Sequence, residues 1–274
     1  MKADISSYKK SSFGPAFLFL SEKQRCALAV YYAFCRLMDD IADEPDIPNP
    51  QEELNFWQEE IQRVFSGSPT TDLGREIARI SKDFDMPADR FLLLIEGMRA
   101  DLQGKTYGSF DELTWYLWRV AGIVGLATLD ILRFKGPRAE QLAQRLGFAV
   151  QTTNIVRDVY DDIKLNRVYL PEDLLEKYDL DRQKVLKGVP CKRLAPVLKD
   201  LAEKSKDFYR LACQTMQGQP YKQMLPCRIM GFVYRANLAK IEKVDFCFSD
   251  AVKLTKFEKL LHCIYALFKT DFID

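Results

Sequence analysis

The 274-residue sequence has a single histidine, His262, and no Cys-x-x-Cys pair among its seven cysteines. Protein zinc sites are built mainly from these two residue types, so a zinc centre is not expected. The chain also lacks Gly-x-Ser-x-Gly, the Walker loop and Gly-x-Gly-x-x-Gly, which argues against a serine hydrolase, a P-loop enzyme and a Rossmann nucleotide site. His262 lies in an apolar C-terminal segment, where we expect a structural role rather than that of a base.

An excess of charge of one sign is missing too, because 40 basic and 39 acidic residues leave a net charge of +1. A nucleic-acid-binding protein should be clearly basic, so no nucleic-acid partner is expected. The odd number of cysteines, and the lack of an apolar signal segment after Met1, lead us to expect reduced thiols and a cytoplasmic location.

No apolar run reaches the roughly 18 residues of a transmembrane helix. The longest, residues 120–132, is interrupted by Asp130. A second apolar stretch, residues 260–268, is short and has Lys256 and Lys269 at its ends. For this stretch we favour a terminal helix docked on the core, and a peripheral contact with a membrane surface is the alternative.

Apolar residues make up 47% of the chain and recur with helical spacing in almost every segment, whereas strand alternation is absent. Two sequences typical of capping boxes, at Ser21 and Ser109, begin long helical segments. We therefore predict an all-α protein in which about ten helices form one compact domain spanning residues 1–274. The predicted helices cover approximately residues 21–44, 51–65, 71–84, 87–103, 109–134, 138–163, a short segment from Pro171, 192–216, 221–243 and 255–268.

A first run of aspartates ends the helix predicted for residues 21–44. Tyr32, Arg36, Asp39 and Asp43 are spaced 4, 3 and 4 residues apart, which places them in one stripe on a helix. The opposite face is apolar and predicts ordinary core packing. Such a stripe is most often a solvent-exposed face with salt bridges, and this run alone does not favour a functional site.

A second aspartate run ends the helix predicted for residues 138–163 and changes that balance. Gln151, Asn154, Asp158 and Asp162 are spaced 3, 4 and 4 residues apart and again form one stripe, with Arg157 beside it. Two long helices thus each present a carboxylate pair preceded by an arginine or an amide. This coincidence favours a site over two solvated surfaces.

The residue types in the two stripes suit a magnesium ion and a diphosphate. Mg²⁺ prefers oxygen ligands and usually shares them between carboxylates and substrate phosphates. Arg36 and Arg157 can hold phosphate oxygens through paired hydrogen bonds. We therefore predict that the two runs face each other across a cavity and hold Mg²⁺ against a diphosphate.

An apolar helical cavity beside such a site suits the ionisation of an allylic diphosphate. Metal and arginine stabilise the leaving group, and a dry cavity protects the carbocation from water. Several aromatic residues are candidates to line the cavity, although plain core packing is the more common role of such residues: Phe13, Phe17, Phe19, Trp115 and Trp118.

The sequence around these runs resembles the squalene/phytoene synthase family. The shared stretches follow the family's order over about residues 8–245. They include Phe-Cys-Arg-x-x-Asp-Asp-x-x-Asp at 34–43, Met-Arg-Ala-Asp-Leu at 98–102, Val-Ala-Gly-x-x-Gly at 120–125, Gln-Thr-Thr-Asn-Ile-Val-Arg-Asp-Val-x-x-Asp at 151–162, Arg-Val-Tyr-Leu-Pro at 167–171 and Tyr-Arg-Ala-x-Leu at 234–238.

The resemblance implies an isoprenoid synthase fold, a single-domain helical bundle with a central cavity. It also implies a prenyltransferase that condenses two prenyl diphosphates head to head, with two or three Mg²⁺ ions bound beside the diphosphate. One diphosphate leaves, the double bond of the second substrate captures its C1, and proton loss closes a cyclopropane, as in presqualene diphosphate.

The resemblance also implies roles for individual residues. Metal ligands are expected at Asp39, Asp43, Asn154, Asp158 and Asp162. Catalytic roles are expected for Tyr32, Arg36, Asp39, Asp43, Arg157, Asp158 and Asp162. Substrate-binding roles are expected for Lys9, Lys10, Ser11, Ser12, Tyr32, Arg36, Gln151, Arg157 and Tyr234.

Two departures from the family pattern, at Trp118 and Tyr160, and one likeness to part of the family, at Arg119, bear on the product. Trp118 replaces a tyrosine that the family associates with carrying the cyclopropyl intermediate onward, which puts a second half-reaction in doubt. Arg119 resembles the residue found there in presqualene diphosphate synthases of bacterial hopanoid routes. Tyr160 replaces a glycine and is expected to narrow the site.

We therefore expect two farnesyl diphosphates as substrates and presqualene diphosphate as the product. Three alternatives stay open: continuation to squalene with NADPH, a carotenoid-type phytoene synthase that uses two geranylgeranyl diphosphates, and a non-catalytic relative. A peripheral membrane contact would serve product release.

Overall fold

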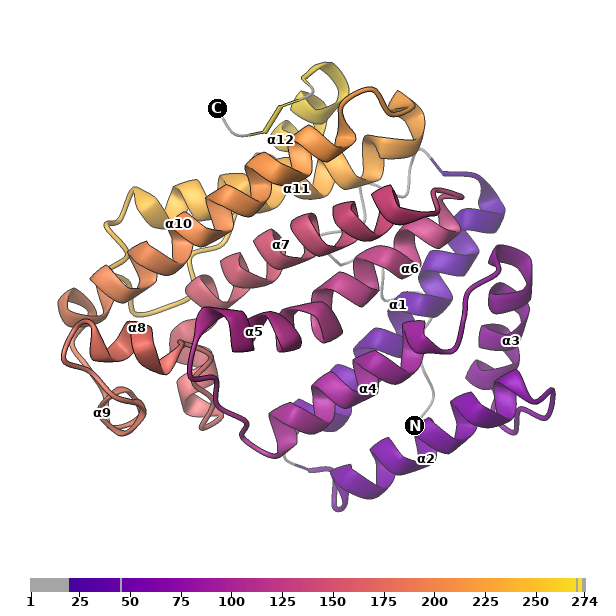
Figure 1. The fold of residues 1–274 in the computed structure, drawn as a ribbon, viewed down its shortest axis with the longest axis horizontal. Coiled ribbons are helices and arrows are strands. Elements are labelled where there is room, and N and C mark those ends of the chain that lie inside the picture. Colours follow the sequence, from indigo (N-terminus) through magenta and orange to yellow (C-terminus); the bar gives the residue numbers. More distant parts are fainter. Residues whose placement is uncertain (1–19, 45, 270, 273–274) are drawn as a thin grey trace.

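The computed structural model describes residues 20–44, 46–269 and 271–272 (Figure 1). All regular secondary structure in that part of the chain is helical, which confirms the predicted all-α class. Several predicted positions lie outside the described residues: Lys9, Lys10, Ser11, Ser12, Phe13, Phe17 and Phe19.

The described residues form twelve α-helices and one π-helical segment, η3, against about ten helices predicted. In chain order they are α1 (Glu22–Asp43), α2 (Pro50–Phe65), α3 (Asp72–Phe84), α4 (Asp89–Leu102), α5 (Phe110–Leu117), η3 (Trp118–Gly122), α6 (Ile123–Ile131), α7 (Pro137–Lys164), α8 (Glu172–Glu176), α9 (Arg182–Leu186), α10 (Cys191–Met216), α11 (Tyr221–Glu242) and α12 (Lys256–Phe268).

The longest helix, α7, runs through the middle of the bundle (Figure 1). Helices α10 and α11 lie on one side of it, and α5, η3 and α6 on the other. Helices α1 and α4 continue the bundle towards α2 and α3, and α12 packs on α11. The two helices that carry the aspartate runs, α1 and α7, thus belong to one packed assembly.

The start of α1 agrees with the sequence prediction, and the start of α5 agrees only in part. Ser21 and Gln24 form the complete capping box that their sequence predicts. At α5, the Ser109 hydroxyl accepts a hydrogen bond from the Glu112 backbone, but the Glu112 carboxylate accepts from Gly108 N–H at 2.8 Å. The prediction of a second capping box is therefore wrong in one of its two hydrogen bonds, the one from the Ser109 backbone N–H to the Glu112 side chain.

The single helix predicted for residues 109–134 is instead α5, η3 and α6, because the middle of this stretch is π-helical. Segment η3 is closely packed between α4 and α7. A Cβ atom added to Gly147 of α7 would lie 2.8 Å from the backbone nitrogen of Gly122, and one added to Gly97 of α4 would lie 2.7 Å from Val120. These glycines allow the close approach. The sequence prediction missed the π-helical segment because the spacing of apolar residues does not distinguish it from the α-helices on either side.

Two cysteines far apart in the sequence form a disulfide. Cys191, at the start of α10, is bonded to Cys247, which follows α11. The expectation of reduced thiols is wrong for this pair, whose separation of 56 residues left no local signal. The other five cysteines are free.

No helix in the described part of the chain combines the length and hydropathy needed to cross a bilayer.

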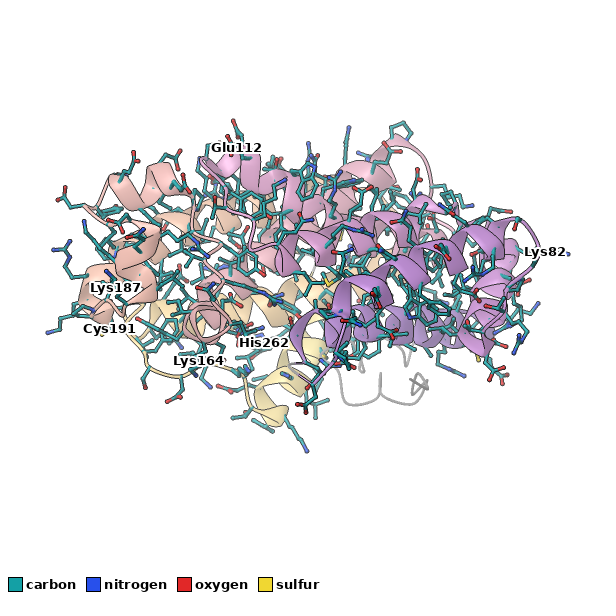
Figure 2. All side chains as sticks on the ribbon, turned by 90° about the horizontal axis from the view of Figure 1, so that it is seen from below. Lys82, Glu112, Lys164, Lys187, Cys191 and His262 are labelled. Atoms are coloured by element: carbon teal, nitrogen blue, oxygen red, sulfur yellow. A yellow bond between two sulfur atoms is a disulfide. The ribbon has the colours of Figure 1, made fainter. Side chains whose placement is uncertain are left out.

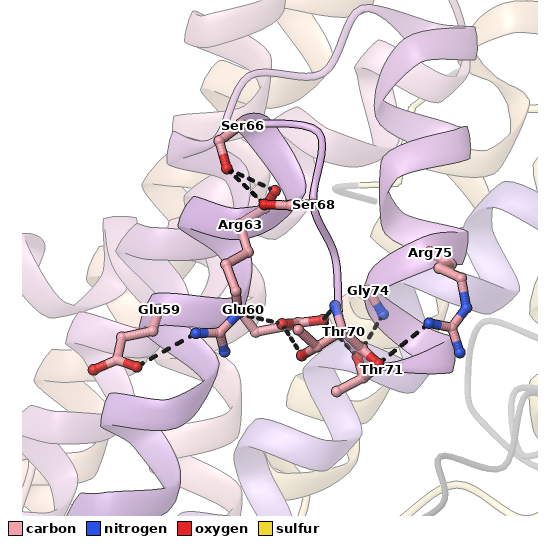
Figure 3. Close-up of polar contacts among 9 residues, drawn as sticks. All are labelled: Glu59, Glu60, Arg63, Ser66, Ser68, Thr70, Thr71, Gly74 and Arg75. Carbon is pink, nitrogen blue, oxygen red and sulfur yellow. Dashed lines mark hydrogen bonds and ion pairs between the residues drawn. The ribbon is translucent and has the colours of Figure 1, made fainter.

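A buried glutamate joins α2 to the start of α3 (Figure 3). The Glu60 carboxylate accepts hydrogen bonds from the backbone N–H groups of Thr70 and Thr71 at 2.8 and 2.7 Å, from both their hydroxyls, and from Arg63 Nε at 2.8 Å. Desolvation by itself would raise the pKa of Glu60, but these hydrogen bonds outweigh it and lower the pKa to about 2.

Replacement of this carboxylate by an amide should destabilise the protein. We expect Glu60→Gln to lower the free energy of unfolding by about 2–4 kcal/mol near neutral pH, since buried donors lose a charged acceptor. Because the folded pKa is depressed, the wild-type contribution is present above the ordinary pKa of 4.5 and is lost as the pH falls through about 2. Urea unfolding at several pH values measures this loss. Glu59→Gln is the matched control, because the Glu59 side chain is 67% exposed and should change stability little.

Candidate active site

A cavity of about 550 Å³ lies between α1, α4, α6, α7 and α11. Its lining changes in character along the two long helices. On α7 the lining residues begin with Leu142 and Leu146 and end with Asp158 and Asp162. On α1 they begin with Leu28 and end at the first aspartates. The cavity therefore has an apolar half and a polar half, and both aspartate runs lie in the polar half.

The structure brings every described residue of the predicted site to this one cavity. The residues concerned are Tyr32, Arg36, Asp39, Asp43, Gln151, Asn154, Arg157, Asp158, Asp162 and Tyr234. The stripes predicted on α1 and α7 thus face a common space, and the opposite face of α1 is buried, with Phe34 0% and Ile41 1% exposed. The individual roles of these residues stay predictions.

The two predicted phosphate-binding arginines are engaged with neighbouring carboxylates. Arg36 forms an ion pair with Asp40 at 2.6 Å. Arg157 donates from Nε to Asp158 at 2.8 Å and forms a second contact through Nη2. The Asp158 carboxylate raises the pKa of Arg157 although desolvation lowers it, and Tyr234 of α11 adds to the rise. Both guanidinium groups are thus held at the cavity by ion pairs with neighbouring carboxylates.

Arg167 and Asp101 also line the polar half, and the residue stripes did not assign them a role. Arg167 follows α7 in a turn where Asn166 has a φ of 58°, and it donates to the Asp43 carboxylate and to the Ala42 carbonyl. It therefore links the end of α1 to the segment after α7. The only signal in the sequence was their place within family-like stretches, because neither residue shares a helical stripe with the aspartate runs.

Asp101, on α4, is held by two stacked phenols. Tyr169 and Tyr116 donate to its two carboxylate oxygens at 2.7 and 3.0 Å, and their ring centroids lie 4.9 Å apart. Desolvation raises the pKa of Asp101 to about 6, against the lowering effect of Tyr169 and Arg167. This arrangement fixes a fifth carboxylate beside the two predicted pairs.

The carboxylates of the two runs influence one another. Burial, followed by the charge of Asp43, raises the pKa of Asp39 to about 7. Burial, followed by the charge of Asp158, raises the pKa of Asp162 to about 8, and Asp43 contributes from the other run. Both runs also lie at the C-terminal ends of their helices, where the helix dipole disfavours negative charge. This crowding of negative charge calls for a cation.

The donor set fits magnesium shared with a phosphate. Asn154 donates from Nδ2 to Gln151, but its Oδ1 is buried and accepts no hydrogen bond from the described residues. With Asp158 and Asp162 on the same stripe, it supplies a third oxygen ligand of the kind that Mg²⁺ prefers. Among the described residues, no group of three or more His, Cys, Asp and Glu side chains could hold a metal by itself. Mg²⁺ in proteins usually takes its remaining oxygen ligands from substrate phosphates and water.

The aromatic and basic residues expected to shape the product lie away from the cavity. Trp118 packs on Gly122 within η3, and Trp115 contacts the side chains of Lys105 and Arg119. Arg119 also pairs with Glu96 at 2.9 Å. None of Trp115, Trp118 and Arg119 lines the cavity, so Trp115 and Trp118 have the favoured core-packing role and not the alternative role of cavity lining.

Tyr160 does not narrow the site either. Its ring packs edge-on against Phe248 at 5.5 Å, and it is not among the cavity-lining residues. The expected narrowing is therefore wrong, because position 160 falls on a different face of α7 from the stripe that ends at Asp162.

The profile of the squalene/phytoene synthase family matches residues 8–258. The chain belongs to this family. Its relatives are prenyltransferases that join prenyl diphosphates head to head and use Mg²⁺ with these substrates. The fold and the pair of aspartate runs predicted from the sequence agree with this membership.

Relatives with different named activities resemble the chain to similar degrees. A presqualene diphosphate synthase of Zymomonas mobilis is 33% identical over 88% of this chain and 83% of its own length. Phytoene synthase 1 of Zea mays is 29% identical over 89% of this chain and 62% of its own length. A 15-cis-phytoene synthase of Synechococcus elongatus is 27% identical over 88% of this chain and 83% of its own.

Solved structures of the family share the fold. A dehydrosqualene synthase in complex with a ligand superposes with a TM-score of 0.86 at 24% identity, over 96% of this chain and 93% of that one. A squalene synthase from Alicyclobacillus acidocaldarius superposes with a TM-score of 0.81 at 23% identity, over 89% and 92% of the two chains. These likenesses confirm the predicted isoprenoid synthase bundle.

The raised pKa of Asp162 predicts that the metal-free protein becomes less stable against unfolding as the pH rises. Because the folded pKa is raised from 3.8 to about 8, the stabilising effect of the proton is present at low pH and is lost as the pH rises through about 8. We expect Asp162→Asn to raise the stability of the metal-free protein at pH 8 by on the order of 1–2 kcal/mol after screening by solvent. Thermal unfolding in a chelator between pH 5 and 9 checks this.

The control for that experiment is Asp161→Asn. Asp161 is 51% exposed and pairs with Lys164 at 2.8 Å, which lowers its pKa. Its replacement should leave the wild-type pH dependence in place. Equal melting temperatures of wild type and Asp162→Asn at pH 8 would contradict the assignment.

Proposed function

We propose that the protein condenses two farnesyl diphosphates head to head into presqualene diphosphate, with release of diphosphate. The observation that carries this proposal is a cavity whose polar half holds two carboxylate pairs, Asp101 and three arginines, and whose other half is lined mainly by aliphatic side chains. Such a cavity can bind a diphosphate at one end and enclose prenyl chains at the other.

The chain's own residues would hold and orient the substrates. Arg36 and Arg157, now paired with Asp40 and Asp158, would exchange these partners for diphosphate oxygens. The carboxylates of the two runs and the Asn154 amide would hold Mg²⁺, which when bound neutralises charge on the diphosphate and makes it a better leaving group. We assign Tyr32, Gln151 and Tyr234, together with the segment from Lys9 to Ser12, to substrate binding.

The apolar half of the cavity would protect the reacting carbons from water. The C1–O bond of one farnesyl diphosphate breaks, and its electrons leave with the diphosphate. The C2–C3 double bond of the second molecule attacks that C1, and loss of a proton from C1 closes the cyclopropane. One diphosphate and one proton are released, and the product keeps the second diphosphate.

Two observations support release of presqualene diphosphate rather than squalene. The relative from Zymomonas mobilis carries that activity in its name and is 33% identical. Position 118, where many relatives have a tyrosine, holds a tryptophan that packs on Gly122 outside the cavity. A phytoene synthase that uses geranylgeranyl diphosphate is the second candidate, because phytoene synthases are 27–30% identical over most of this chain.

The direct test is turnover by the purified full-length protein with Mg²⁺. Farnesyl and geranylgeranyl diphosphate are supplied separately, with and without NADPH, and products are identified by mass spectrometry. We expect presqualene diphosphate from farnesyl diphosphate in both conditions. Formation of squalene when NADPH is present would contradict the product assignment. Faster conversion of geranylgeranyl diphosphate to phytoene would favour the second candidate. If neither substrate is turned over, the proposal that the protein is an enzyme is rejected.

A matched pair of variants tests the site itself. Asp158 lines the cavity, whereas Asp161, three residues further along α7, pairs with Lys164 at the surface. We expect Asp158→Asn to lower kcat/KM by about 100-fold or more, since a ligand to the leaving group's cation is lost. Asp161→Asn should stay within about twofold of wild type. Equal activities of the two variants would remove the second aspartate run from the proposed site.

A further inference from the structure

The outer face of α12 carries an unusual amount of exposed apolar surface. Five large hydrophobic side chains of this 13-residue helix are exposed: Phe257 (74%), Leu260 (56%), Ile264 (43%), Tyr265 (42%) and Phe268 (82%). In the described part of the chain, only five other large hydrophobic residues are classed as exposed. Contiguous apolar surface of this kind marks an interaction site more often than scattered single residues do.

The exposed residues form a stripe along the helix. Phe257, Ile264 and Phe268 lie at intervals of 7 and 4 residues and so point in nearly the same direction. The opposite face packs on the protein through Cys263 and Ala266, which are 7% and 0% exposed. Surface helices normally turn their apolar face inward, whereas α12 also presents apolar residues to solvent.

This helix is fixed to the body of the protein. A capping box of Thr255 and Glu258 begins it, and Lys240 of α11 donates to both Glu258 oxygens at 3.0 and 2.9 Å. At the other end, the Tyr221 hydroxyl contacts the Ala266 carbonyl at 3.0 Å. Figure 2 shows α12, in yellow, protruding at the lower edge of the molecule, near the labelled His262. The apolar stripe is therefore a formed surface and not a loose tail.

Positive charge lies at both ends of the stripe. Lys253 and Lys256 precede it and Lys269 follows it, and all three are exposed. The one acidic residue of the helix, Glu258, is paired with Lys240. Asp271, beyond the helix, accepts a hydrogen bond from the buried Cys213. An apolar strip with lysines at its ends is complementary to a bilayer that contains anionic lipids.

The stripe is small for a stable protein interface. A helix of this length is about 20 Å long and about 10 Å wide, so its outer face covers roughly 200 Å². A stable dimer buries about 800 Å² on each partner. Insertion into a lipid surface needs no matching partner surface of that size.

We propose that α12 docks the protein on the surface of a bilayer that contains anionic lipids. Phe257, Ile264 and Phe268 would enter the boundary between headgroups and acyl chains, and the lysines would lie among the headgroups. Helix α11, on which α12 packs, lines the cavity through Met230 and Tyr234. Docking would thus hold the cavity about one helix diameter from the lipid. Release of a water-insoluble prenyl product into the membrane is a benefit that rests on the proposed function, whereas the docking itself does not depend on that function.

The test is flotation of the full-length protein with vesicles of phosphatidylcholine, with and without phosphatidylglycerol, and without substrate. We expect binding that increases with phosphatidylglycerol, and Phe257→Ser combined with Phe268→Ser should lower partitioning about tenfold or more. The control double variant is Phe56→Ser with Phe65→Ser, exposed phenylalanines of α2. Lys256→Glu with Lys269→Glu should abolish the preference for anionic vesicles, whereas Lys82→Glu with Lys187→Glu, far from α12 in Figure 2, should not.

Circular dichroism confirms that each variant is folded before vesicles are added. Asp158→Asn should float as wild type does, so failure of the proposed reaction and failure of docking are distinguishable. The proposal is overturned if wild type does not float, or if the α12 variants float as well as wild type. It is also overturned if the wild type is a dimer that the α12 variants convert to a monomer, because a second copy of the chain would then cover the stripe. It is overturned too if flotation requires deletion of residues 1–19, because that segment would then cover the stripe.

Discussion

The arrangement of the site depends on one electrostatic conflict, the crowding of carboxylates at the ends of two helices. Asp39 and Asp43 close α1, Asp158 and Asp162 lie near the end of α7, and both helix dipoles disfavour negative charge there. Burial adds to the mutual repulsion, so that the pKa values of Asp39 and Asp162 rise to about 7 and 8. A fold selected for stability alone would not gather these groups, and a bound divalent cation would offset their mutual repulsion.

Hydrogen bonds and ion pairs from neighbouring elements hold the carboxylates in position. Arg167 reaches the end of α1 from the turn after α7, and two phenols fix Asp101 between the runs. Behind them, Gly97 and Gly147 let η3 approach α4 and α7 closely enough to build the cavity wall. The aliphatic half of the cavity is thus continuous with ordinary core packing, and only the polar half departs from it.

The sequence predicted what helical periodicity and local motifs can carry, namely the all-α class, most helix bounds and the two stripes. It did not assign Arg167 or Asp101, because each reaches the site from a separate element and shares no period with the aspartate runs. The same limit applies to the disulfide of Cys191 and Cys247, 56 residues apart. Trp118 and Tyr160 show a further limit, since a departure from a family pattern identifies a position but not the direction in which its side chain points.

The sequence of α12 likewise does not show which of its apolar side chains face the protein and which face solvent. Its periodicity predicts a terminal helix docked on the core, and the structure contains that docking through Cys263 and Ala266. Yet the residues that face solvent are as apolar as those that face inward. Contact with water gives them none of the favourable free energy that burial of apolar surface provides. Helix α11 lines the cavity through Met230 and Tyr234 and also contacts α12, so the exposed apolar stripe lies one helix away from the candidate site.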